Sequence, residues 1–195
     1  MNEFKSQSQA GQDIFAWICS GKKRDGTFLD IGSGPAVNYN NSYALEQVGW
    51  TGNLIDITES ARESSVQFRK AKFHMENAAR ISAWSHIIGE TRWIDYLSLD
   101  VDESSHQALL NLPGYVRFGI ITIEHDHYRF GDAPRSSMRT FLDRAGYILV
   151  ASDVKDQGLE FEDWWVDTRY VENAEPFRSQ SADWKDVVAK ALPCL

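Results

Sequence analysis

Cysteine is scarce in this sequence, whose 195 residues include only Cys19 and Cys194. Two cysteines so far apart fit neither the spacing of a zinc motif nor that of a redox-active dithiol, so we expect no cysteine-based metal or redox centre. Long apolar runs are also missing, because a stretch such as YILVA at residues 147–151 is far too short to cross a bilayer. The polar first residues lack the apolar segment of a signal peptide. We therefore expect a cytoplasmic protein without a membrane partner.

Basic residues are outnumbered by acidic ones, with 20 Lys and Arg against 28 Asp and Glu and a formal net charge of -8. Non-specific nucleic-acid binding needs cations that neutralise phosphates, so we expect no nucleic-acid partner. A hydrophobic content of 43% suits one domain with a sizeable core. We predict a single domain over residues 1–195. It would comprise an N-terminal helical segment (1–25), an α/β core (26–172) and a C-terminal helical tail (173–195).

Short apolar segments alternate along the chain with segments of helical periodicity. Strands are predicted at residues 27–31, 52–57, 72–79, 93–101, 118–125, 147–153 and 163–171. Helices are predicted at residues 13–20, 40–49, 58–71, 81–89, 104–112, 136–146 and 181–192. This alternation predicts an α/β fold with a doubly wound, mostly parallel sheet. Within it, we expect FEDWWVD at residues 161–167 to be an edge strand.

The segment GTFLDIGSGPAVNYNN, residues 26–41, places an acidic side chain inside an apolar strand and follows it with glycines. Gly32 and Gly34 indicate a sharp turn or a backbone that a ligand approaches closely. In open α/β sheets, ligands bind at the carboxyl ends of the strands, where this loop would lie. A tight turn with Asp30 as its stabilising carboxylate is the alternative interpretation.

Two classes of cofactor compete for this loop. A dinucleotide site needs a third glycine, and Val37 stands in its place. S-adenosylmethionine has no phosphates, but needs close backbone approach and acidic partners for its amine and its ribose hydroxyls. Asp30 would supply the first partner, and Asp56, at the end of the next strand, the second. Since NAD enzymes also carry an acidic residue there, Asp56 by itself does not discriminate.

Several further segments, in this order, resemble the FkbM-type methyltransferases. They are SQAGQD (8–13), FLDIGSG (28–34), NNSYALEQVGWTGNLID (40–56), IDYLSLDVD (94–102), ITIEH (121–125), AGYILV (145–150) and DWWVD (163–167). The resemblance implies a Rossmann-like fold of the class I methyltransferase type and S-adenosylmethionine as methyl donor. It also implies an acceptor hydroxyl on a saccharide or small metabolite. The implied cofactor contacts are Gln12, Asp30, Gly32, Gly34, Asp56, Asn77 and Ala78.

The resemblance weakens after the fourth strand, where the family commonly has Asp-Val-Glu-Gly-Ala-Glu and this chain has DVDESS. Asp100 is kept and counts among the catalytic candidates. A hydroxyl acceptor benefits from a general base, for which EHDHYR at residues 124–129 offers His125 first and His127 second. One histidine capping the strand end and the other in solvent is the alternative.

Four carboxylates around these strand ends could instead hold Mg²⁺ or another divalent cation that polarises the acceptor oxygen. They are Asp100, Asp102, Glu103 and Glu124. Alternatively, Asp102 or Ser104 caps the following helix and the other carboxylates are solvated.

Two other functions stay open. One is a methyltransferase fold that binds the cofactor or a partner without turnover, and the other is an NAD-binding oxidoreductase. The chain is short for the family it resembles, so the acceptor site would be either open or completed by the second subunit of a homo-oligomer.

Overall fold

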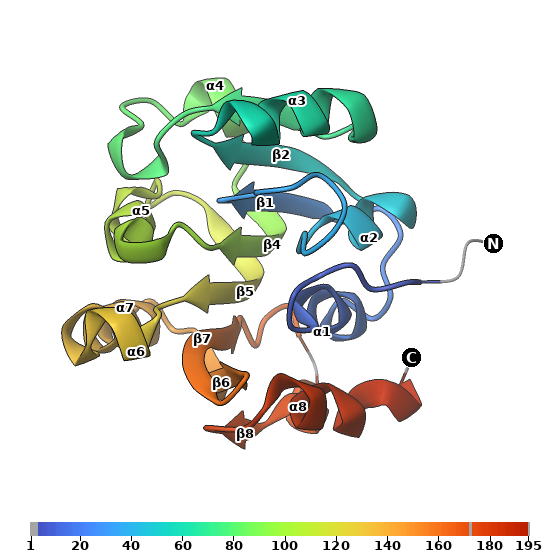
Figure 1. Ribbon diagram of the computed structural model, residues 1–195, viewed down its shortest axis with the longest axis vertical. Helices are drawn as coiled ribbons and strands as arrows, with labels where there is room; N and C mark the ends of the chain where they lie inside the picture. Colours follow the sequence, from blue (N-terminus) through green and yellow to red (C-terminus); the bar gives the residue numbers. More distant parts are fainter. Residues whose placement is uncertain (1–3, 172, 195) are drawn as a thin grey trace.

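The computed structural model of the protein describes residues 4–171 and 173–194 and has one eight-stranded sheet with helices on both faces (Figure 1). The strand order is β3-β2-β1-β4-β5-β7-β6-β8. The strands are β1 (Thr27–Ile31), β2 (Thr51–Asp56), β3 (Lys72–Met75), β4 (Trp93–Leu99), β5 (Arg117–Glu124), β6 (Ile148–Asp156), β7 (Leu159–Val166) and β8 (Ser179–Gln180).

The helices lie between these strands and at both ends of the chain. The α-helices are α1 (Gln12–Cys19), α2 (Tyr43–Gln47), α3 (Glu59–Phe68), α4 (Ser85–Ile88), α5 (Ser105–Asn111), α6 (His127–Phe130), α7 (Asp132–Arg144) and α8 (Trp184–Ala191). Short 3-10 turns are η1 (Ala78–Arg80), η2 (Asp102–Ser104), η3 (Glu175–Phe177) and η4 (Leu192–Cys194). In the described residues, no helix combines the length and apolar character needed to span a bilayer.

The core has two parts, one on each face of the sheet. One contains buried residues of α1, α2 and α8, and the other contains those of α4, α5 and α7. The strands alternate between the two parts, as Leu54 and Ile55 of β2 do. The predicted α/β class with a doubly wound, mostly parallel sheet is therefore confirmed. The pairs among β1 to β5 are all parallel, whereas β7 runs antiparallel to both of its neighbours.

The prediction that residues 161–167 form an edge strand is wrong. They lie mainly in β7, which pairs with β5 on one side and β6 on the other. Trp164 is fully buried in one part of the core, and Trp165, which is 2% exposed, is buried in the other part. Both faces of the sheet are therefore covered by other elements at this strand. The edges of the sheet are β3 and the two-residue β8.

Several predicted elements have other boundaries than expected. The helix expected at 81–89 is only the short α4, although Ile81 and Trp84 are buried beside it. Strand β6 extends to Asp156 and turns into β7 through Gln157 and Gly158, both of which have positive φ. The segment expected to be a helical tail also contributes β8 before α8 begins.

Candidate functional site

A cavity of about 250 Å³ opens at the carboxyl ends of the parallel strands β1, β2 and β4 and continues past β3. Six of the predicted site residues line it, namely Gly32, Asp56, Asn77, Ala78, Asp100 and Asp102. The other lining residues are Ile31, Ile55, Ile57, Thr58, Glu76, Val101 and Ser104. Most of the lining residues end a strand or follow its end within three residues, so the rule that ligands bind at carboxyl ends could have identified Thr58 and Glu76 from sequence.

Gly32 brings the ends of three strands together. Its backbone N–H donates to the carbonyl oxygen of Ile55 over 2.8 Å, which ties the end of β1 to β2. Its φ is +78°, and a Cβ there would lie 1.5 Å from the carbonyl oxygen of Asp100 and 2.9 Å from Cγ1 of Val101. Only glycine satisfies both the left-handed conformation and this contact with the end of β4. Gly34 also has positive φ, +54°, but a Cβ there would make only an ordinary contact of 3.9 Å with the carbonyl oxygen of Gly32.

The carboxylate of Asp56 is half-buried at the cavity wall and organises the loops around it. Its Oδ2 accepts from the N–H of Gly34 over 3.0 Å. Its Oδ1 accepts from the N–H and the hydroxyl of Thr58, each over 2.8 Å. A carboxylate has about four acceptor positions, so these bonds leave about one for a ligand in the cavity.

Asp30 lies beneath the glycine loop and does not line the cavity. Its side chain is buried, and Oδ2 accepts from the Ser42 hydroxyl over 2.6 Å. Burial raises the pKa of Asp30, while the Ser42 hydrogen bond and the Arg69 charge oppose that rise. Arg69 donates to Ser42 over 2.9 Å and pairs with Glu46 over 3.4 Å. Asp30 therefore fixes the loop against α2.

Asn40 completes this buried network, which the sequence did not reveal. Its Nδ2 donates to the carbonyl oxygen of Ser33 over 2.8 Å, and its Oδ1 accepts from the N–H of Tyr43 over 2.7 Å. The same Oδ1 accepts from Arg69 over 3.0 Å. The polar run NYNN after the glycines was the only available signal, and it does not say which asparagine turns inward.

Gln12 is buried at the start of α1, behind the carboxyl end of β5, and is not a lining residue of the cavity. Its Oε1 accepts from the N–H of Ala10 over 2.8 Å, and its Nε2 donates to Glu162 over 2.7 Å. Burial, helped by the negative charge of Asp100, raises the pKa of Glu162 to about 8.

Asp100 and Glu124 form a carboxyl pair at the ends of the adjacent strands β4 and β5. Burial raises the pKa of both, and the hydrogen bond between them favours the proton on Glu124, whose pKa rises to about 12. Glu124 is therefore the member of the pair that holds a proton more tightly. Asp100 is the member that lines the cavity.

The four carboxylates predicted to bind a cation do not form one group of ligands. The structure brings oxygens of Asp102, Glu124 and Asp126 within 4.8 Å of one another, whereas Glu103 is exposed and outside this group. Arg129 already holds two of the three, donating to Asp102 over 2.6 Å and to Asp126 over 3.0 Å. Its guanidinium supplies the positive charge that a cation would bring, so these residues do not fit a Mg²⁺ site. Nor does the alternative cap form, since neither Asp102 nor Ser104 makes a side-chain cap at the start of α5.

His125 and His127 do not line the cavity. His125 is fully buried, with Nδ1 accepting from the N–H of His127 over 3.2 Å and Nε2 lying 3.4 Å from the carboxylate of Asp163. Arg139 holds that carboxylate through two hydrogen bonds of 2.7 Å. His127 lies 3.5 Å from Glu160. Both histidines thus belong to an ionic network between α7 and the β6–β7 hairpin.

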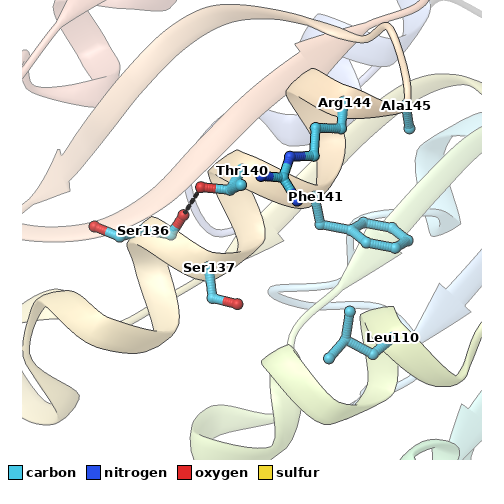
Figure 2. A pocket seen from close by; sticks show the side chains of 7 residues that line it. All are labelled: Leu110, Ser136, Ser137, Thr140, Phe141, Arg144 and Ala145. Carbon is cyan, nitrogen blue, oxygen red and sulfur yellow. Dashed lines mark hydrogen bonds between the residues drawn. The ribbon is translucent and has the colours of Figure 1, made fainter.

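A larger hollow of about 570 Å³ lies elsewhere, between α5 and α7 (Figure 2). Its lining residues are Leu110, Ser136, Ser137, Thr140, Phe141, Arg144 and Ala145. Phe141 points toward Leu110 across the hollow, and Arg144 is its one charged residue. It has neither carboxylates nor a glycine turn, so we place the candidate site in the smaller cavity.

The architecture resembles solved methyltransferase structures. The TrmK protein of M. capricolum, in complex with S-adenosyl-homocysteine, superposes with a TM-score of 0.57 at 13% identity, over 85% of this chain and 71% of that one. A TehB-like SAM-dependent methyltransferase from Corynebacterium glutamicum gives 0.53 at 18%, over 82% and 88%. The class I methyltransferase fold is thereby shown. No family model and no curated protein sequence matches the chain, so the FkbM resemblance stays a prediction.

Proposed function

We propose that this protein is an S-adenosylmethionine-dependent methyltransferase that acts on a hydroxyl of a saccharide or small metabolite. The observation that carries the proposal is the 250 Å³ cavity, which lies at the ends of β1, β2 and β4 and has Asp56 in its wall. Structural neighbours that share the fold include a protein in complex with S-adenosyl-homocysteine. The FkbM resemblance supports the hydroxyl acceptor. A cytoplasmic location is inferred separately, from the composition of the sequence.

Each part of the cofactor has a partner of suitable chemistry. The remaining acceptor capacity of Asp56 suits a ribose hydroxyl. Asn77 and Ala78, past the end of β3, would border the adenine, beside the apolar side chain of Ile57. The methionine part would lie against Gly32, which lines the cavity. Asp30 would contribute by positioning this loop, and Gln12 by packing behind the site.

The same loop disfavours a dinucleotide. A pyrophosphate is bound at the N-terminus of a helix that begins at the glycine turn. Here the helix after the turn, α2, begins only at Tyr43 and has five residues. Asn40 and Ser42 hold the intervening segment in an irregular path, so no helix start faces the glycines. We therefore set aside the NAD-binding alternative.

When bound, S-adenosylmethionine supplies an electrophilic methyl group on a positively charged sulfur. The chain must then place the acceptor oxygen in line with that methyl group and take its proton. Asp100 is the best-placed base, because it lines the cavity and its partner Glu124 holds a proton more tightly. Burial raises the pKa of Asp100, which makes it a stronger base than an ordinary aspartate. His125 is less suitable, because one ring nitrogen accepts a backbone N–H and the other faces Asp163.

The test is transfer of a labelled methyl group to a panel of saccharides and hydroxylated metabolites. Asp100→Asn should lower the rate by about 10²- to 10⁴-fold while affinity for the methyl donor is kept. His127→Ala, which alters a partly exposed side chain outside the cavity, is the matched control and should retain the rate. Full activity of Asp100→Asn would refute the base. Donor binding without transfer to any acceptor would favour the non-catalytic alternative. A separate measurement of mass in solution would show whether the protein forms the homo-oligomer whose second subunit could complete the acceptor site.

A further inference from the structure

Three metal-ligating side chains converge at the edge of the sheet beyond the cavity. His74 belongs to the edge strand β3, Glu76 follows that strand, and His86 lies in α4. One potential ligand atom from each lies within 4.8 Å of the other two. Two imidazoles and one carboxylate form a donor set that zinc favours, whereas Mg²⁺ and Ca²⁺ prefer oxygen ligands throughout.

Both imidazoles are oriented by a second partner. Nδ1 of His86 hydrogen-bonds the carbonyl oxygen of Ala83, and its Nε2 faces Oε1 of Glu76. Nε2 of His74 lies 2.9 Å from Oδ1 of Asn53, so a proton on that nitrogen leaves Nδ1 free as a ligand. Metal-bound histidines characteristically donate their other N–H to a carbonyl or carboxylate in this way.

This group also differs from the other two carboxylate-containing groups found among the described residues. Arg129 pairs with two members of the group Asp102, Glu124 and Asp126. Arg139 pairs with both carboxylates of the group His125, Asp153 and Asp163. In contrast, none of the ion pairs described joins an arginine or lysine to Glu76. Lys72 acts on both imidazoles electrostatically and is the nearby charge that opposes a cation.

We propose that His74, Glu76 and His86 form a binding site for a zinc-class divalent ion. Three protein ligands leave one position of a tetrahedral site for water or another ligand. Ligand atoms around zinc are about 3.3 Å apart for bonds of about 2.0 Å, so Nε2 of His86 and Oε1 of Glu76, which are 2.5 Å apart, must separate to admit the ion. The side chains of His86 and Glu76 are 50% and 34% exposed and are free to make that adjustment. The ion would join β3 to α4 and fix Glu76, which also lines the cavity.

Calorimetric titration of Zn²⁺ into the full, tag-free chain tests this site, with Mg²⁺ titrated in parallel. We expect one Zn²⁺ per chain and no comparable Mg²⁺ binding. His86→Ala and Glu76→Gln should each weaken Zn²⁺ binding by more than about tenfold, since even the loss of a second-shell partner costs that much. His106→Ala is the matched control, because His106 bonds Ser137 on α7 and lies outside the group. It should bind Zn²⁺ as the wild type does.

Cobalt absorption bands typical of four-coordinate nitrogen and oxygen ligands should appear in the wild type and be lost in His86→Ala. Thermal unfolding without metal checks that both variants fold, which their exposed side chains favour. Absence of stoichiometric Zn²⁺ binding, or equal binding by the wild type and both variants, would overturn the proposal. The site does not depend on the proposed methyltransferase activity, so either can fail without the other.

Discussion

Replacing Gly32 by alanine tests the junction on which the cavity depends. An L-residue at φ +78° costs about 1–2 kcal/mol. The new Cβ would also lie 1.5 Å from the carbonyl oxygen of Asp100, so the ends of β1 and β4 must separate. Overpacking of this kind costs about 1–3 kcal/mol. The two contributions add to a loss of about 2–5 kcal/mol in unfolding free energy.

Gly34→Ala is the matched control, because it shares the positive φ and lacks the steric contact. We therefore expect the unfolding free energy of Gly32→Ala, measured in urea, to be about 1–3 kcal/mol lower than that of Gly34→Ala. In a chain of this size the two melting temperatures should differ by about 2–12 °C. Equal losses for the two variants would refute the assigned contact with β4.

Three further changes test the buried charges. Arg69→Ala removes the partner of the buried Glu46 carboxylate and should cost about 3–5 kcal/mol in urea unfolding; a loss under about 1 kcal/mol would contradict it. The pKa of Asp163 is lowered to about 2, because hydrogen bonds from Arg139 outweigh the burial that would raise it. The stabilisation that ionised Asp163 provides is present above pH 3.8 and is lost as pH falls toward 2. Asp163→Asn should therefore flatten the acid limb of a plot of unfolding free energy against pH. An unaltered acid limb would contradict this prediction. Burial raises the pKa of Glu162 to about 8, so its contribution is present below pH 4.5 and is lost as pH rises to about 8. Glu162→Gln should gain stability relative to wild type over that window, and parallel profiles would exclude the effect.

The position of the cavity could be predicted from the sequence. In a parallel sheet the carboxyl ends of neighbouring strands meet at one edge, so residues that follow different strands converge there. That rule brings Gly32, Asp56, Asn77 and Asp100 together without knowledge of any side-chain direction. The two-faced alternation of strand residues likewise predicts helices on both sides of the sheet.

The directions of the side chains could not be predicted from the order of strands in the sequence. Asp30 was predicted as a ligand partner, but Ser42, twelve residues later, draws its carboxylate under the loop. His125 follows a strand as Asp100 does, yet its ring is held by the buried carboxylate of Asp163 on β7, which neighbours β5 in the sheet but is distant in the sequence. The segment with Trp164 and Trp165 was predicted to be an edge strand, because the sequence alone does not show which strands pair with it on either side. Such contacts join segments whose pairing is set only by the complete fold.

Calorimetric titration with S-adenosylmethionine, S-adenosylhomocysteine and NAD tests the assigned cofactor most directly. We expect wild-type protein to bind the first two in the micromolar range and not to bind NAD. Asp56→Ala, after thermal unfolding has shown that it folds, should bind both methyl-cycle ligands at least about tenfold more weakly, because a hydrogen bond to a charged group contributes about 1.5–3 kcal/mol. Failure of the wild type to bind either ligand, or undiminished binding by Asp56→Ala, would contradict the assignment of this cavity.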